Sequence, residues 1–575
     1  MKKHYLPILK NYIRYLIISP LLVLVYVLCE TAQPMLMGSI VDEGVMKKDL
    51  PVILSTGGIM ILLSLLAIAA SISNLYCASK TATGFAAELR KKMFHRIQEF
   101  AFADIDKFST ASLITRMTND TTVLQQVIQR SMLLLYRAPL MIIVAFFFVI
   151  RINSDIAAYI GIAIPILGVS IFFLLRKGFP LFMQVQKKLD ELNRVVRENL
   201  INIKVVKSFV REEHEKEKFS AANTDYRDTA VKAVNIMITA IPIMQMIMNL
   251  LIIIILWVGG VKSAETGIEI GKLMSLVNYS LQILMTFMMV SMIFVMFARA
   301  SASSRRVIDV LDTDPSIVDT NPSVNSVITK GGIEFRNVCF QYDSAGENAQ
   351  LKDIDFKINP GETIAVVGAT GSGKSTLLQL IPRLYDVTEG EVLIDGKNVK
   401  DYPLHEIRGA IGVVLQKNEL FSGTILDNLK WGNPDAVFEE VVDAAKSAEA
   451  HDFILSFPDG YETRLGQGGV NLSGGQKQRL CIARALLKRP RILLLDNSTS
   501  AVDTDTERKI KYNLKHKLRE TTVLLVTQRY SSMEDSDRVL LLEGGKIEAT
   551  GTPARLLEQS PLYREIYESQ ALLSS

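Results

Sequence analysis

Six long apolar segments in the first half of the chain limit its fold more than any other feature. They lie at residues 15–37, 52–76, 132–150, 157–175, 236–258 and 273–297. Each is close to the roughly 20 residues that a helix needs to cross the hydrocarbon core of a bilayer. A backbone in lipid has no water to bond, so each such segment must satisfy its N–H and C=O groups as a helix. The sequence therefore predicts an all-α transmembrane domain of six helices.

Composition agrees with a membrane protein of more than one domain. The chain has 575 residues, 49% of them hydrophobic, and a mean hydropathy of +0.24, which is too long for one domain and too apolar for an ordinary soluble enzyme. Basic and acidic residues nearly balance, 64 against 60, so we expect no nucleic-acid partner. The four cysteines are scattered without metal or disulfide spacing, which fits a reducing cytosolic side.

The placement of Lys and Arg predicts the orientation. The first span contains Pro20 and Glu30 and lacks a small-residue cleavage site, so we read it as a retained span rather than a signal peptide. Basic residues gather in the N-terminal tail and in the long segments after spans two and four. The positive-inside rule then places these segments and both termini in the cytosol, with short outer connections. We expect a multi-pass protein of the bacterial cytoplasmic (inner) membrane, with the lipid bilayer as a partner.

The two long segments between spans, 79–130 and 176–235, keep helical periodicity without being apolar enough for lipid. They predict long cytosolic extensions of the spanning helices. Near their turning points, 108–119 and 198–213 mix apolar and basic residues. Val205, Val206, Phe209 and Val210 would expose a large apolar area on a solvated hairpin. We therefore predict that both stretches dock on a protein surface.

The second half of the chain has a different pattern. Residues 301–325 are rich in Ser and Asp and contain Pro315 and Pro322, as in a linker. From Ile333 onward strands alternate with helices, which predicts an α/β domain. We predict a transmembrane domain at 1–305, a linker at 306–332 and a nucleotide-binding domain at 333–575.

A phosphate-binding loop carries the chemistry of that domain. The β-branched run 363–367 leads into GATGSGKST at 368–376, and a helix-like run follows. This is the strand, loop and helix context of a P-loop. Backbone N–H groups of such a loop hold phosphate, Lys374 reaches the β- and γ-phosphates, and Ser375 offers its hydroxyl to Mg²⁺. The predicted cofactors are ATP and Mg²⁺, and the predicted loop residues are Gly368, Thr370, Gly371, Ser372, Gly373, Lys374, Ser375 and Thr376.

A second motif, NLSGGQKQR at 471–479, is followed by an acidic strand that ends at Asp496. With these motifs in this order after six spans, the chain resembles an ATP-binding cassette (ABC) exporter half-transporter of the six-span multidrug type, over essentially its whole length. The resemblance implies ATP-driven export of amphipathic compounds or drugs by alternating access.

The same resemblance implies roles for individual residues. Tyr342 matches the aromatic residue that stacks on adenine, although a half-buried strand tyrosine is the alternative. Gln416 and Asp496 would join Ser375 around Mg²⁺, and Asp503 lies in a loop that crosses the cassette dimer. The motif that faces ATP on the opposite cassette would be Leu472, Ser473, Gly474, Gly475 and Gln476.

Two residues depart from the family pattern at catalytic positions. Asn497 stands where the family has the glutamate that polarises the attacking water, and Gln528 stands where it has a histidine. An amide cannot accept the proton, and general-base catalysis typically contributes about 10² to 10⁴ in rate. This pattern predicts the degenerate-site subunit of a heterodimer, whose partner is a second half-transporter with a complete site. Slow hydrolysis at both sites of a homodimer is the alternative.

Polar residues within the spans are candidates for the transport pathway. Glu30 is an ionisable group inside span one, whereas Arg137 lies at the inner end of span three, where we expect it to snorkel. The remaining candidates share helix faces in spans five and six: Gln245, Asn249, Asn278, Gln282, Met285, Met289 and Met292. They fit a cavity for an amphipathic small molecule and equally fit helix packing. Export of lipids or peptides, and a regulatory or channel-like protein gated by ATP, are alternatives.

Overall fold

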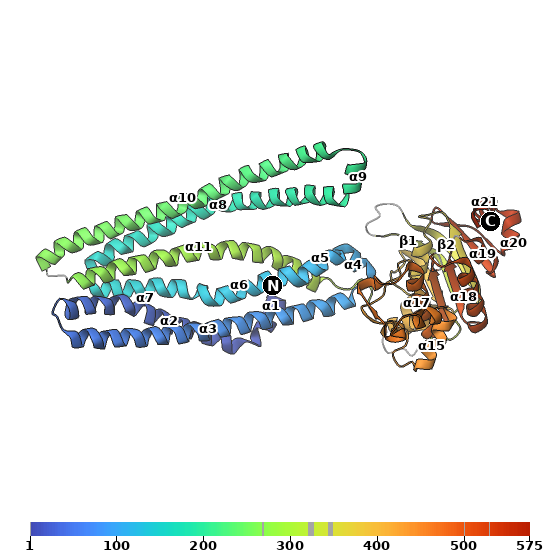
Figure 1. Cartoon of the computed structure of the whole chain (residues 1–575), viewed down its shortest axis with the longest axis horizontal. Coiled ribbons are helices and arrows are strands. Elements are labelled where there is room, and N and C mark those ends of the chain that lie inside the picture. Colours follow the sequence, from blue (N-terminus) through green and yellow to red (C-terminus); the bar gives the residue numbers. More distant parts are fainter. Residues whose placement is uncertain are drawn as a thin grey trace. The chain divides into compact units, whose positions relative to one another are not determined.

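The computed structural model describes residues 2–266, 269–319, 327–342, 349–498, 501–527 and 529–574. The chain forms two compact units (Figure 1). The first consists of Met1–Gln98 and Ala111–Thr313, and the second of Glu99–Thr110 and Asp314–Ser575.

The first unit is helical throughout its described length. The six predicted spans lie in α2 (Ile13–Ser39), α3 (Leu50–Glu99), η3 and α7 (Ser131–Leu135 and Arg137–Ile152), α8 (Ser154–Ile201), α10 (Glu212–Thr266) and α11 (Ile270–Asp312). Shorter elements complete it: α1 (Lys2–Lys10), η1 (Ile40–Val45), α5 (Thr110–Thr115), η2 (Arg116–Asp120), α6 (Thr121–Arg130) and α9 (Ile203–Ser208). Four stretches in the described part are long and apolar enough to cross a membrane, Ile13–Val45, Leu50–Glu99, Thr110–Ile152 and Pro242–Val261, and Ser154–Ser170 is a shorter apolar helix. The predicted helical fold of this half is confirmed.

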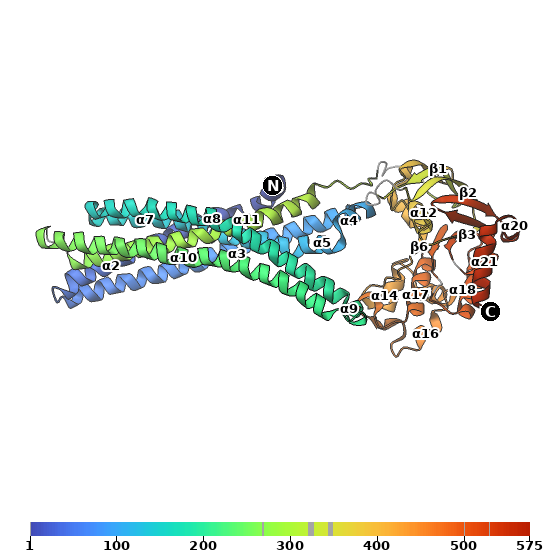
Figure 2. The ribbon, with the colours of Figure 1, turned by 90° about the horizontal axis from the view of Figure 1, so that it is seen from above.

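The helices continue far beyond the apolar segments, as predicted. Helix α3 has 50 residues, and at about 1.5 Å per residue it is about 75 Å long, against a hydrocarbon core of about 30 Å. Helices α8 and α10 run side by side and are joined through α9 (Figures 1 and 2). Around α9, Phe209 and Val210 are 73% and 80% exposed. These two apolar side chains are exposed and available for the predicted docking, which stays a prediction.

Helices α2 and α11 contact each other closely at one end. Both carboxylate oxygens of Asp42 accept backbone N–H groups at the start of α11, from Gly271 at 2.6 Å and from Lys272 at 3.1 Å. A Cβ atom on Gly271 would lie 2.2 Å from the carbonyl oxygen of Gly38. Two further hydrogen bonds continue the contact, Ser275 Oγ to Pro34 O at 2.6 Å and Tyr279 OH to Thr31 O at 2.6 Å. The two spans approach backbone to backbone because both positions are glycine.

The predicted start of the linker differs from the structure. Helix α11 continues to Asp312, past residue 306, because Val307, Val310 and Leu311 recur at helical spacing and are buried. Arg306 also bonds both carboxylate oxygens of Asp120 in η2. The Ser and Asp content of this stretch predicted a linker, but its buried apolar residues keep it helical to Asp312.

The segment Glu99–Thr110, which contains α4 (Phe102–Phe108), belongs to the second unit. Asp104 Oδ2 accepts the backbone N–H of Ala101 at 2.9 Å and that of Ser316 at 3.0 Å. The hydroxyl of Tyr385 donates to Asp106 at 2.7 Å. The two aspartates therefore bond this segment to the rest of the second unit. Of the predicted docking stretch 108–119, residues 108–110 belong to this segment and 111–119 to the first unit, and its docking stays a prediction.

The second unit is built on three sheets. A four-stranded antiparallel sheet has the order β2 (Leu351–Ile358), β1 (Ile333–Phe340), β4 (Glu389–Ile394) and β5 (Lys397–Asn398). A six-stranded sheet has the order β12 (Lys546–Gly551), β11 (Arg538–Glu543), β3 (Thr363–Gly368), β10 (Thr522–Val526), β9 (Ile492–Asp496) and β6 (Ile411–Val414). The third pairs β7 (Gly423–Thr424) with β8 (Arg464–Leu465).

Helices surround these sheets and complete the apolar cores. The α-helices are α12 (Lys374–Leu380), α13 (Leu404–Ala410), α14 (Ile425–Lys430), α15 (Phe438–Ser447), α16 (His451–Leu455), α17 (Gly474–Leu487), α18 (Thr504–Lys517), α19 (Tyr530–Glu534), α20 (Pro553–Gln559) and α21 (Pro561–Ser574). Three short 3₁₀ turns are η4 (Val399–Asp401), η5 (Gly460–Glu462) and η6 (Gln467–Gly469). One core joins the first two sheets with α12, a second joins β6 and β9 with α14 to α18, and a smaller one packs α19 to α21 against β3 and β11. The predicted α/β fold is confirmed.

The close contact of α2 and α11 predicts that Gly271→Ala destabilises the protein. The added methyl group would overlap a backbone oxygen that cannot rotate away, and overpacking of this kind typically costs about 1–3 kcal/mol. Gly57→Ala is the matched control, because among the described residues no atom beyond its own helical turn lies within 4 Å of a Cβ atom at that position. Thermal unfolding of the full-length protein in detergent measures both. Equal midpoints for the two variants would contradict the packing described here.

Candidate functional site

The candidate site lies where four parallel strands end. Val526 on β10 is in register with Val366 on β3 and with Asp496 on β9, and β6 continues this parallel order beside β9. The loop 368–376 leaves β3, Asp496 ends β9, and Gln416 follows β6 by two residues. The carboxyl ends of parallel strands share one edge, which is where ligands bind in open α/β sheets. The structure thus brings these three predicted parts to the same edge.

The loop after β3 has the backbone that its glycines permit. Gly371 and Gly373 have φ of +85° and +96°, values that favour glycine. Lys374 is only 7% exposed. Its ammonium donates to Gly368 O at 2.9 Å, to Ala369 O at 2.6 Å and to Ser372 Oγ at 3.4 Å. Burial lowers the pKa of Lys374, and the neighbouring Asp496 opposes that shift. The loop therefore encloses a positive charge.

Asp496 has the environment of a cation ligand. The residue is 6% exposed, and its Oδ1 has no hydrogen-bond partner within the described ranges. Burial raises the pKa of the carboxyl group, while a hydrogen bond from Ser375 and the charge of Lys374 lower it. A buried carboxylate oxygen without a partner is costly, and a hard cation such as Mg²⁺ takes oxygen ligands of this kind. Ser375, Asp496 and the exposed Gln416 fit the predicted Mg²⁺ site.

Tyr342 lies beside the loop helix. Its hydroxyl is 3.1 Å from Thr376 Oγ1 and donates to Gln379 Oε1 at 3.1 Å, so two residues of α12 hold it. Its ring meets Phe340 and Tyr385 edge to face. The tyrosine is half-buried, which leaves part of the ring accessible. Both the predicted stacking role and the structural alternative fit this position.

The second motif forms the start of α17. Leu472 is buried in the core, and Ser473 caps the helix by accepting the N–H of Gln476 at 3.3 Å. Gln476 Oε1 in turn accepts the N–H of Ser473 at 2.9 Å. A Cβ atom on Gly475 would lie 2.8 Å from Ala501 O. In the described part of the chain, these side-chain hydrogen bonds stay within the motif and do not reach the loop after β3.

Asn497 occupies a special backbone position at the same edge. Its φ is +48°, its N–H donates to Val526 O at 3.1 Å, and its carbonyl accepts Gln478 Nε2 at 3.0 Å. Asparagine is one of the few residues that tolerate this conformation. Gln528 and residues 499–500 lie outside the described residues. Asp503 caps α18 by accepting the N–H of Thr506 at 2.9 Å, and such backbone hydrogen bonding lowers its pKa.

Gln478 is a site residue that was not predicted from the sequence. Its amide is buried and bridges Asn497 O to the N–H of Ala501 at 3.0 Å each. The signal was present, since Gln478 lies one helical turn beyond Gly474 on the same face of α17. Its position on the helix face that carries the motif could have identified this polar residue as part of the site.

The position of Arg137 corrects one expectation about the membrane half. Arg137 does not snorkel: its Nη2 donates to Tyr26 OH at 2.8 Å and to Glu30 at 3.1 and 3.3 Å. The guanidinium also lies 4.5 Å from the centre of the Tyr26 ring. Glu30 is thus one half of an ion pair between α2 and α7, because a charge within a membrane span needs a partner.

The amide and methionine candidates occupy two helices. Gln245 and Asn249 are exposed and line a groove of about 380 Å³ along α10 with Pro242, Met246, Leu250 and Ile253. On α11, Asn278 bonds its own helix at Met274 O, and Gln282 Oε1 is buried without a partner among the described residues. Met285 is exposed, Met289 is half-buried, and the side chain of Met292 lies outside the described part. Their role stays a prediction.

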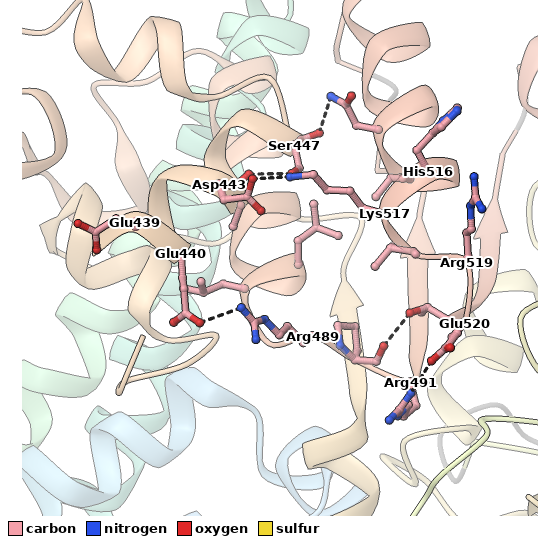
Figure 3. A pocket seen from close by; sticks show the side chains of 18 residues that line it. Glu439, Glu440, Asp443, Ser447, Arg489, Arg491, His516, Lys517, Arg519 and Glu520 are labelled. Atoms are coloured by element: carbon pink, nitrogen blue, oxygen red, sulfur yellow. Dashed lines mark hydrogen bonds and ion pairs between the residues drawn. The ribbon is translucent and has the colours of Figure 1, made fainter. Parts of the chain in front are cut away.

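A large hollow of the second unit lies at the opposite edge of the sheet. It measures about 830 Å³ and borders the amino ends of β9 and β10, at Arg491 and Thr521 (Figure 3). Its charged walls pair with each other: Arg489 with Glu440 at 2.8 Å, Lys517 with Asp443 at 2.5 Å and Arg491 with Glu520 at 3.4 Å. It therefore lies away from Asp496 and is not part of the candidate site.

Comparison with known proteins assigns the family. The profile described as ABC transporter transmembrane region matches residues 16–297, and the profile described as ABC transporter matches residues 351–500. The ABC transporter ATP-binding protein YfiB of Bacillus subtilis is 41% identical over 96% of both chains. The chain belongs to the ABC transporter family. Among solved structures, a bacterial Atm1-family ABC exporter with ATP bound superposes with a TM-score of 0.81, at 26% identity, over 97% of this chain and 98% of that one.

These likenesses confirm the resemblance at the level of an ABC exporter. YgaD of Bacillus subtilis, named for multidrug export, is 32% identical over 86% of both chains. The chain is an ABC exporter subunit with a membrane-spanning helical domain and an ATP-binding, ATP-hydrolysing type of cassette. ABC exporters act as dimers in the lipid bilayer, so the chain works with a second subunit.

The unpaired oxygen of Asp496 predicts how this ABC exporter uses Mg²⁺. Asp496→Asn should remove the stimulation of ATP binding by Mg²⁺ and leave binding in EDTA nearly unchanged, because the amide keeps the shape but loses the charge. Fluorescent-nucleotide titration of the full-length protein, with and without Mg²⁺, measures both. Asp503→Asn is a control carboxylate outside the loop edge. Unchanged Mg²⁺ stimulation in the Asp496 variant would exclude it as a ligand.

Proposed function

We propose that this chain is the degenerate-site half of a heterodimeric ABC exporter. Its own P-loop holds ATP·Mg²⁺ with little hydrolysis, and its LSGGQ motif completes the hydrolytic site on a second, catalytically complete half-transporter. The observation that carries the proposal is Asn497, an amide placed directly after the metal-side Asp496 at the carboxyl edge of the sheet.

The retained parts of the site support nucleotide binding. Lys374 supplies a buried positive charge for the phosphates, and Tyr342 offers a partly open ring for adenine. Ser375, Gln416 and Asp496 would hold Mg²⁺, which on binding neutralises charge on the β- and γ-phosphates. The phosphate-loop set named from the sequence is intact. Binding chemistry is therefore kept.

The changed parts oppose hydrolysis. An amide at 497 cannot take a proton from water, and Gln528 cannot carry the positive charge of a protonated histidine. Both changes fall on catalytic positions while the binding residues stay intact. Random decay would affect both classes, so the pattern favours a division of labour between two subunits over a slow homodimer.

The start of α17 supports action on the partner's nucleotide. The hydroxyl of Ser473 accepts a hydrogen bond from Gln476, so its own proton stays available to donate. Backbone N–H groups at the start of this 14-residue helix add the positive end of the helix dipole. These donors fit a γ-phosphate presented by a second cassette. Asp503, the N-cap of α18, fits the loop that crosses the dimer.

The substrate that fits best is an amphipathic compound or drug, exported from the cytosol across the bacterial inner membrane. The open groove with Gln245 and Asn249, and the methionines of α11, offer hydrogen bonds beside adaptable apolar surface. The basic segments after spans two and four support cytosolic termini and a cytosolic cassette. Lipid or peptide export and an ATP-gated channel are the alternatives. Uptake against a gradient into inside-out vesicles separates a pump from a channel.

Turnover of the chain alone tests the degenerate site. The purified protein should bind ATP·Mg²⁺ but hydrolyse it at least about a hundredfold more slowly than the complete complex, because the general base is missing. Asn497→Glu should restore only part of the activity, since glutamate tolerates the positive φ less well and Gln528 remains. Steady-state ATPase with parallel nucleotide binding measures this. Ordinary exporter turnover by the chain alone would refute the proposal.

A variant of the signature helix tests the action in trans. Ser473→Ala in this chain should lower hydrolysis by the heterodimer by about 10² or more, because it removes a preorganised donor from the partner's active site. Thr424→Ala is the matched control, since Thr424 caps α14 in the same way. Trapped-nucleotide counting should find the P-loop of this chain still occupied. Near-normal turnover would mean that this motif does not serve the active site.

A further inference from the structure

An ion pair on a buried carboxylate joins two segments that flank the nucleotide edge. Glu507 on α18 is 1% exposed and forms an ion pair with Arg529, the residue that follows position 528. Arg529 Nη2 also donates to the carbonyl of Val502 at 2.9 Å. We propose that Arg529, held by Glu507, is a positioning residue that fixes the loop 501–503 to the chain after β10, and that ATP hydrolysis by the dimer depends on this bridge.

The ion pair is built to hold one orientation. Glu507 also accepts Ser532 Oγ at 2.9 Å and pairs with Lys511 at 3.0 Å. A buried carboxylate needs such partners, so its position is determined by several groups at once. Arg529 uses one guanidinium nitrogen for Glu507 and another for Val502. A planar guanidinium can serve two acceptors in fixed directions, which an ammonium group does less well.

The loop 501–503 is held equally firmly from its other side. Gln478 accepts the N–H of Ala501 and donates to the carbonyl of Asn497, so one buried amide joins α17 to the position after Asp496. Gly475 lies against the carbonyl of Ala501, where it has no room for a side chain. Residues 501–502 therefore contact the signature helix on one side and Arg529 on the other.

This arrangement gives the bridge a functional consequence. Arg529 follows β10, whose last residue Val526 is in register with Asp496. A shift of the chain after β10 is transmitted through Arg529 to Val502, and from Ala501 to the start of α17. The inference concerns contacts inside one chain, so it applies to a heterodimer and to a homodimer alike.

The decisive variant is Arg529→Lys in the full-length chain, reconstituted in lipid nanodiscs as the dimer that hydrolyses ATP. Lysine keeps the positive charge beside Glu507 but loses the second fixed donor to Val502. We expect kcat to fall roughly ten- to a hundredfold, the cost of a misplaced catalytic geometry, with KM for ATP and nucleotide occupancy unchanged. Arg529→Ala should fall at least as far.

Lys511→Ala is the matched control, because it also removes a positive partner of Glu507, one that lies on the same helix α18. It should keep kcat within about twofold. Wild-type turnover by Arg529→Lys would overturn the proposal, since charge alone would then suffice. Equal losses in Arg529→Lys and Lys511→Ala would also overturn it. Thermal unfolding of each variant distinguishes loss of folding from loss of turnover. Ordinary ATPase activity of the chain alone would refute the heterodimer proposal, but it would not change the comparison between these variants.

Discussion

The parallel pairing of β3, β10, β9 and β6 is the constraint on which the nucleotide edge depends. Val526 is opposite both Val366 and Asp496, so a shift of one residue in β10 would separate the phosphate loop from the metal-side carboxylate. Because these strands are buried on both faces, their apolar side chains determine the register. Core packing therefore determines the geometry of the catalytic positions. Asn497 is also held by a hydrogen bond from its backbone N–H to Val526 O on β10.

The sequence predicted the broad architecture because its signals are strong and local. Twenty-residue apolar runs allow few structures in lipid, and the P-loop and LSGGQ motifs place their residues on known turns. The apolar runs and the two motifs depend on periodicity and on short spacing, which one sequence contains in full. The grouping of Gln416, Asp496 and Ser375 around Mg²⁺ was implied by the resemblance to ABC exporters.

Long-range contacts could not be predicted in the same way. The partner of Arg137 is Glu30, 107 positions earlier, and no local pattern links them. Residues 306–312 were read from their polar content, although Val307 and Val310 continue the buried stripe of α11. Glu507, Arg529 and Gln478 form their bridges only after the sheet has assembled. Apart from 306–312, where a local helical pattern was overlooked, each miss concerns a side chain whose partner is determined by the tertiary structure.

The second unit is discontinuous in sequence. Asp104 and Asp106, which precede it by some 200 residues, bond Ser316 and Tyr385 within it. A fragment that begins after α11 would leave the Ser316 N–H and the Tyr385 hydroxyl without these acceptors. The cassette of this chain is thus completed by a piece of polypeptide synthesised long before it. During synthesis on the ribosome, residues 99–110 can form these contacts only after the second half of the chain has been made.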